Sequence, residues 1–271
     1  MKWHLKHFAG KVLSGSRLYA ASLRAKGVVV LFHRVDGRLA GNPLSCSEEE
    51  FRTWCTFFKD HFNVVGLGDF VRRLKAGASV GEHLCITFDD GYLDNYTAAA
   101  PELSRQGLPA AFFVSTGFIG SNTVPWWDRD LQTPPQWMSW DNVRELSGAG
   151  FEIGAHTINH VHMGKVPEAE AEREVLGSGT RLEAELGRKP EHFAYPYGSR
   201  EHINAINHRV VRRAGFLSCF SAYGGLVSEG DDPLAIQRLP ISPWHRSPSQ
   251  LLTELVVEAY RPSHVPERFA A

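Results

Sequence analysis

Two neighbouring carboxylates, Asp89 and Asp90, follow the apolar run 85–88 and precede Gly91. Successive residues of a strand point to opposite faces, so both carboxylates can serve one pocket only where the strand ends and the backbone turns. Gly91 permits such a turn because it lacks a β-carbon. Two crowded carboxylates repel each other unless a proton, a cation or a metal neutralises one of them. The pair therefore predicts a positively charged partner, such as a metal ion with further ligands elsewhere in the chain.

Two histidines, His156 and His160, follow a second short apolar run at 151–155. Their spacing of four residues predicts that both imidazoles lie on one face of a helical turn. Two histidines and one carboxylate, with a position left for water, form a common ligand set for catalytic zinc, and similar open sites hold iron or other divalent metals. Together the two motifs predict one divalent metal ion, with zinc preferred and other transition metals as alternatives.

These segments resemble the polysaccharide deacetylases of carbohydrate esterase family 4. Residues 87–91 (TFDDG) resemble that family's first signature, residues 156–160 (HTINH) its second, and residues 193–198 (FAYPYG) a variant of its third. The order and spacing agree, and the resemblance extends from about Val28 to Trp244. It implies an α/β fold, a distorted, incomplete (β/α) barrel of the polysaccharide deacetylase type, with the site at the carboxyl-terminal ends of the strands.

The resemblance also assigns roles to individual residues. It implies that the metal ligands are Asp90, His156 and His160. Asp89 is then the general base that takes a proton from the attacking water. The hydroxyl of Thr157 would brace the histidine loop, and the backbone N–H of Tyr197 would help to hold the oxyanion.

The proton donor to the leaving amine has two candidates, and a general acid contributes about 10²–10⁴-fold to the rate. The apolar run 28–35 predicts a buried strand that ends in His33. This run resembles the first-strand signature of the exopolysaccharide-biosynthesis branch of the family. His245 lies near the C-terminal end of the domain, where many family members carry this histidine. We favour His33; its alternative role is that of a strand-end residue bonded to a loop carbonyl.

The third signature of the family often has an arginine two residues before the proline, where this chain has Ala194. Arg238, in the strand-like run 235–241, is the candidate replacement. A guanidinium can pair with a carboxylate such as Asp89 through two parallel hydrogen bonds. The alternative is a surface arginine.

The loop 117–139 is rich in tryptophan and too irregular for a regular element. Because apolar sugar faces stack on aromatic rings, we expect Trp126 and Trp127 to form a substrate lid or subsite wall, with Asp128 and Arg129 as a charged pair at its rim. The alternative is packing of the loop against itself. Tyr92 and Tyr197, each beside a predicted catalytic position, are further predicted sugar contacts, which completes the substrate-binding set of Tyr92, Trp126, Trp127 and Tyr197.

Composition limits the class of protein. The 271 residues, 43% of them hydrophobic, can fill one large α/β domain. A net charge of −1 gives no general attraction to nucleic acid. The four cysteines form no CxxC motif, which favours reduced thiols and a cytoplasmic location. Association with the inner face of the membrane is the alternative. The sequence leaves the oligomeric state open.

Three segments are expected along the chain. Residues 1–27 should form a basic amphipathic helix, residues 28–262 the deacetylase barrel, and residues 263–271 a flexible tail. The first segment has basic but no acidic residues, and it lacks the apolar stretch of a signal peptide or a membrane span. We expect this helix to pack on the barrel; peripheral contact with an anionic membrane is the alternative.

The predicted function is that of a metal-dependent hydrolase that removes N-acetyl groups from an amino sugar in a polysaccharide or glycan precursor. The substrate partner is then an N-acetylated glycan. One alternative is a hydrolase of another linear or cyclic amide on the same fold. Another is a non-catalytic glycan-binding protein, against which the intact set of Asp89, Asp90, His156 and His160 argues.

Overall fold

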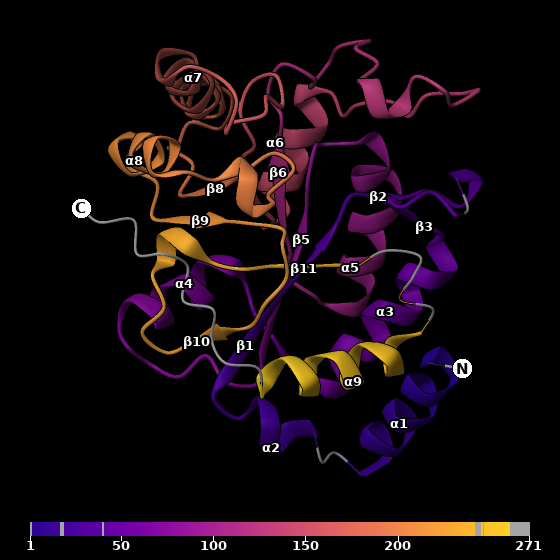
Figure 1. Ribbon diagram of the computed structural model, residues 1–271. Helices are drawn as coiled ribbons and strands as arrows, with labels where there is room; N and C mark the ends of the chain where they lie inside the picture. Colours follow the sequence, from indigo (N-terminus) through magenta and orange to yellow (C-terminus); the bar gives the residue numbers. More distant parts are fainter. Residues whose placement is uncertain (1, 17–18, 40, 242–244, 246, 261–271) are drawn as a thin grey trace.

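The computed structural model describes residues 2–16, 19–39, 41–241, 245 and 247–260. A curled sheet with the strand order β10-β1-β5-β6-β7-β8-β9 forms its centre, and helices surround it (Figure 1). From β1 to β9 all neighbours are parallel, so the carboxyl-terminal ends of these strands meet at one edge. These strands are β1 (Lys26–Phe32), β5 (His83–Phe88), β6 (Ala111–Val114), β7 (Glu152–Ala155), β8 (His192–Ala194) and β9 (Ser218–Phe220).

Shorter strands complete the β structure. They are β2 (Arg34–Val35), β3 (Ser45–Cys46), β4 (Asn63–Val64), β10 (Val227–Ser228) and β11 (Leu239–Pro240). Strands β10 and β11 both pair with the edge of β1 opposite β5, β10 antiparallel at Lys26 and Gly27 and β11 parallel at Val30 and Leu31. Apolar runs in the sequence predict strands at 84–88, 110–114, 151–155, 192–194 and 217–220, and the structure confirms these within one residue. The strand predicted at 64–67 is mostly wrong, because β4 ends at Val64 and α4 begins at Leu67.

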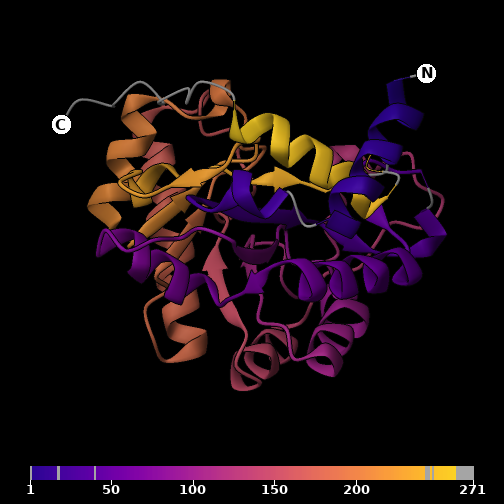
Figure 2. The ribbon, with the colours of Figure 1, turned by 90° about the horizontal axis from the view of Figure 1, so that it is seen from below.

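The α-helices lie around the sheet, as seen in Figure 1 and from below in Figure 2. They are α1 (Lys2–Ser16), α2 (Tyr19–Leu23), α3 (Glu48–His61), α4 (Leu67–Lys75), α5 (Ala100–Gln106), α6 (Trp140–Gly148), α7 (Glu168–Leu186), α8 (Ala205–Ala214) and α9 (Pro248–Ala259). Helix α3 begins with a capping box, in which Ser47 Oγ accepts a hydrogen bond from Glu50 N and the Glu50 carboxylate accepts one from Ser47 N.

The segment from Ile236 to Pro240 spans the gap between the two ends of the curled sheet. Ile236 forms an isolated bridge with Phe220 at the end of β9, and β11 pairs with Val30 and Leu31 of β1. Only two residues of the predicted strand 235–241 are therefore regular strand, because this segment must cross from one edge to the other. The distorted, incomplete barrel predicted from the sequence is confirmed.

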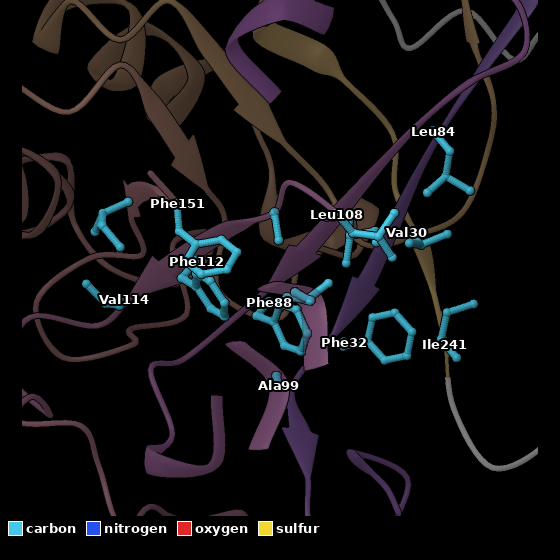
Figure 3. Close-up of a cluster of buried hydrophobic side chains, with 14 of the residues drawn as sticks. Val30, Phe32, Leu84, Phe88, Ala99, Leu108, Phe112, Val114, Phe151 and Ile241 are labelled. Atoms are coloured by element: carbon cyan, nitrogen blue, oxygen red, sulfur yellow. The ribbon is translucent and has the colours of Figure 1, made fainter. Parts of the chain in front are cut away.

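Alternation along the strands divides the core into two clusters. Val30, Phe32 and Phe88 point outward and pack under the helices, with the rings of Phe88 and Phe112 stacked 4.9 Å apart (Figure 3). A second cluster, which contains Val29, Cys85, Phe113 and Phe220, packs with the apolar face of α4.

The helix expected over residues 1–27 is present as two helices, α1 and α2, and Lys26 and Gly27 already belong to β1. Helix α9, from the other end of the chain, lies against both (Figure 1). Among the described residues, no helix combines the length and apolar character needed to cross a membrane. The predicted tail at 263–271 lies outside the described residues.

We predict that Phe112→Ala lowers the free energy of unfolding by about 3–5 kcal/mol, because it leaves a cavity among rings that are fully buried. Urea unfolding at pH 7 measures this. Phe8→Ala is the control: its side chain is 68% exposed, so a change below about 0.5 kcal/mol is expected. Similar losses in both variants would contradict the packing described here.

Candidate active site

Asp89 and Asp90 leave the end of β5 in different directions. Cys85, Thr87 and Asp89 alternate along the inner face of the sheet, and Asp90 turns away with a backbone φ of +77°. Asp90 Oδ1 lies 3.4 Å from His156 Nε2 and 3.2 Å from His160 Nε2. The structure thus brings Asp90 and both predicted histidines together, and all three side chains are buried.

The helical turn expected for His156 and His160 is wrong. Residues 156–160 form an irregular loop in which Thr157 and His160 have φ of +64° and +53°. Left-handed backbone at residues other than glycine is unfavourable and clusters at functional sites. The loop lets the two rings converge, with centroids 5.0 Å apart. The Nδ1 of His156 lies 2.8 Å from the carbonyl of Ala194, a contact that leaves Nε2 directed at Asp90.

A residue that the sequence did not indicate holds this loop. Glu174, buried in α7, accepts hydrogen bonds from the backbone N–H of Ile158 and of Asn159, both at 2.8 Å, and from Asn159 Nδ2 at 2.7 Å. The bracing role expected of the Thr157 hydroxyl is not found, because this buried oxygen has no hydrogen-bond partner among the described residues. One acidic residue among several in a helix gives no sequence signal for such a role.

The residues present fit a divalent cation. One ligand atom each of Asp90, His156 and His160 lies within 4.8 Å of the others. Asp90 Oδ1 is buried and has no hydrogen-bond partner among the described residues. Leaving a buried polar atom without a partner is costly, unless a further group binds to it. Burial raises the pKa of Asp90, but the neighbouring imidazoles of His160 and His156 outweigh it and hold this pKa well below its usual range. The carboxylate is therefore ionised and ready to coordinate.

Arg238 makes the two parallel hydrogen bonds that we expected with Asp89. Nη1 donates to Oδ1 at 2.7 Å and Nη2 to Oδ2 at 2.6 Å, and both side chains are buried. The guanidinium is fixed in turn, because Nε donates to the carbonyl of Ser221 at 2.8 Å. The ring of Phe113 lies beneath it at 5.2 Å.

A cleft of about 500 Å³ opens above these groups, within the size range of small-ligand sites. It is lined by Leu31, His33, Leu44, Asp89, Asp90, Trp126, Trp127, His156, His160, Tyr197, Ser199, Glu201, His202, Ala222 and Pro240. The imidazole of His33 reaches the cleft and makes no hydrogen bond to the described residues, so the alternative loop-carbonyl contact is not found. His245 is not part of this lining; it lies 3.0 Å from Glu254 of α9.

The aromatic loop reaches the cleft through Trp126 and Trp127. Trp126 is 62% exposed, and its Nε1 donates to the hydroxyl of Tyr197 at 3.1 Å. The ring of Trp127 lies 4.7 Å from that of His160. Tyr197 has a φ of +62°, and its backbone N–H has no acceptor among the described residues.

Two expectations for this loop need correction. Tyr92 is 0% exposed and does not line the cleft, so it is not placed to contact a sugar; it stacks on Trp137 at 4.4 Å. Asp128 is not at a charged rim with Arg129. It is buried and pairs with Arg34 at 2.7 Å, while Tyr92 donates to its second oxygen at 2.8 Å. The hydroxyl of Tyr92 also accepts from Trp127 Nε1, so this buried network anchors the aromatic wall.

The fold and the site define a barrel protein whose strand ends carry a donor set suited to metal-assisted hydrolysis. A family model described as polysaccharide deacetylase matches residues 76–217, more than half of the chain. The protein belongs to the polysaccharide deacetylase family. This confirms the predicted enzyme class, a hydrolase that removes N-acetyl groups from a glycan.

Two curated relatives have similar sequences. Bacillus subtilis YxkH is 22% identical over 81% of this chain and 72% of its own. A poly-beta-1,6-N-acetyl-D-glucosamine N-deacetylase of Staphylococcus aureus is 24% identical over 73% of this chain and 68% of its own.

Solved structures show the same fold. IcaB from Ammonifex degensii has a TM-score of 0.72 at 24% identity, covering 87% of this chain and 97% of its own. The Streptococcus pyogenes deacetylase PplD, solved with acetate, has a TM-score of 0.71 at 19% identity, covering 86% and 99%.

We predict that Asp128→Ala lowers the free energy of unfolding by about 3–5 kcal/mol, because it leaves the buried Arg34 without its charge partner. Replacing both residues in Arg34→Met/Asp128→Leu should recover much of this loss. Asp141→Ala, which removes an exposed ion pair with Arg144, is the control and should cost less than about 1 kcal/mol. Chemical denaturation distinguishes these outcomes, and an Asp128 variant as stable as the control would contradict the anchor.

Proposed function

We propose that the protein is a metal-dependent N-deacetylase of an N-acetylated amino sugar in a polysaccharide or glycan precursor, and that zinc is its preferred metal. The observation that carries the proposal is the convergence of His156 Nε2 and His160 Nε2 on the buried, unsatisfied Oδ1 of Asp90. A divalent ion held by these three residues would polarise the acetamide carbonyl and make water acidic enough to lose a proton near neutral pH.

The other residues have separate tasks in this proposal. Asp89 takes a proton from the water that attacks the carbonyl carbon, and the two hydrogen bonds from Arg238 keep its carboxylate oriented. The unpaired N–H of Tyr197 is a candidate donor to the oxyanion that forms on the carbonyl oxygen.

His33 is the proposed acid. The C–N bond breaks as the amine nitrogen takes a proton from its imidazolium, which yields acetate and a free amino sugar. Burial lowers the pKa of His33 against the opposing effect of Asp90 and Asp89, so its imidazolium is a stronger acid than an exposed one. His245 is the second candidate, and its contact with Glu254 outside the cleft lining speaks against it.

The substrate proposal uses the relatives as well as the cleft. The Staphylococcus aureus relative is named for poly-beta-1,6-N-acetyl-D-glucosamine, and we propose a glycan of N-acetylated hexosamine for this chain. Trp126 and Tyr197, joined by a hydrogen bond at the cleft, offer aromatic faces for sugar rings. Acetate release from such oligomers tests this activity. Ring opening of a simple cyclic amide, without acetate release from the oligomers, would favour the alternative of a hydrolase of other amides.

We predict one divalent ion per chain, lost in the His156→Ala/His160→Ala variant because two ligands are removed together. Elemental analysis after dialysis against trace metal measures this. His192→Ala is the control, since His192 contacts Ser218 and Glu152 and is not part of the cleft lining. Full metal retention in the double variant would remove the basis for the site.

We predict that His33→Ala lowers kcat on an acetamide substrate by about 10²–10⁴, the range for loss of a general acid, with metal content unchanged. An activated aryl acetate needs no proton on its leaving group, so its hydrolysis should fall much less. His245→Ala is the matched control. Equal losses on both substrates would indicate a lost contact or misfolding, and a selective loss in the His245 variant would move the acid there.

A further inference from the structure

One end of the cleft carries a polar pair that the proposed mechanism does not use. Glu201 and His202 both line the cleft and belong to the short turn η4 (Arg200–His202). His202 is buried, and the Glu201 carboxylate is exposed. His162 packs edge-on against the ring of His202, with centroids 4.0 Å apart. The three side chains offer ligand atoms within 4.8 Å of one another, so either a cation or a polar ligand has to be considered.

The hydrogen bonds of His202 decide between these ligands. Ser199 N–H donates to His202 Nδ1 at 3.0 Å as part of a capping box. An N–H can only donate, so Nδ1 is the acceptor nitrogen and the neutral ring has its proton on Nε2. A protonated Nε2 cannot coordinate a metal, but it can donate a hydrogen bond. This arrangement favours a hydroxylated ligand over a second cation.

The donor and the acceptor of this pair do not satisfy each other. His202 Nε2 and Glu201 Oε1 are 3.5 Å apart, too far for a strong hydrogen bond. A sugar hydroxyl both accepts and donates, so one hydroxyl can accept from Nε2–H and donate to the carboxylate. A bond to a charged group is stronger than one between neutral groups.

The position of the pair suits a neighbouring sugar unit. The ring of Tyr197 lies between it and the catalytic groups, with its centroid 4.6 Å from His160 and 5.1 Å from His202. Tyr197 is also hydrogen-bonded to Trp126, so the aromatic side chains of the cleft adjoin both the catalytic centre and this pair.

We propose that Glu201 and His202 form a binding subsite for the hydroxyls of a sugar unit next to the one that is deacetylated. The inference rests on the proposed function and adds to it the residues that would bind a second sugar unit.

The test measures binding in the metal-loaded Asp89→Asn variant, which should not turn over. Calorimetry gives the Kd of N-acetylglucosamine and of its β-1,6-linked tetramer. The Kd of N-acetylglucosamine divided by the Kd of the tetramer should fall about tenfold when Glu201→Gln is added, because the tetramer loses a charged acceptor. His202→Asn should lower it similarly. Asn142 and Asn207 occupy the equivalent position in two other capping boxes of this chain, so asparagine keeps the cap and removes the reach into the cleft.

Glu229→Gln, an exposed charge outside the cleft lining, is the control and should leave the ratio unchanged. A Kd ratio that is unchanged in both subsite variants overturns the inference. A second metal ion per chain that is lost in His202→Asn also overturns it, because it would indicate a cation site. Acetate release from the tetramer by the protein with Asp89 intact tests the proposed function separately. Acetate release with an unchanged Kd ratio overturns only the subsite. The absence of both acetate release and tetramer binding overturns the proposed function itself.

Discussion

The crowding of Asp89 and Asp90 at the end of β5 is the constraint on which the site depends. Two adjacent buried carboxylates cannot both remain ionised without positive partners. The structure gives each its own: Asp89 has Nη1 and Nη2 of Arg238, and Asp90 faces His156 and His160. In the proposed mechanism, this separation lets Asp89 act as the base while Asp90 serves as a metal ligand.

The same requirement connects the site to the closure of the barrel. Arg238 lies in the segment that bridges β9 to β1, and its side chain points inward to Asp89 on β5. The irregular segment is therefore held in part by the ion pair that orients the base. Removing one charge of a buried pair leaves the other uncompensated, so we expect this residue to couple barrel stability to the proposed catalysis.

Sequence patterns identified the strands and the charges better than the loops. Apolar runs located β5, β7 and β8, and the arginine missing from the third family signature led to Arg238, which is 149 positions from Asp89. The left-handed residues that shape the histidine loop could not be predicted, since Thr157 and His160 have no local preference for that conformation. The role of Glu174 and the burial of Tyr92 depend on distant segments that pack against them. The residues around them in the sequence therefore predict neither.

Asparagine variants of the two aspartates test the central claim most directly, because each keeps the side-chain shape and removes one charge. Metal content and acetate release should be measured in parallel for both proteins. We expect Asp89→Asn to keep its metal and lose turnover, whereas Asp90→Asn should lose the metal as well. Metal loss in Asp89→Asn with retention in Asp90→Asn, or turnover at the unchanged rate in Asp89→Asn, would contradict the division of roles between these carboxylates.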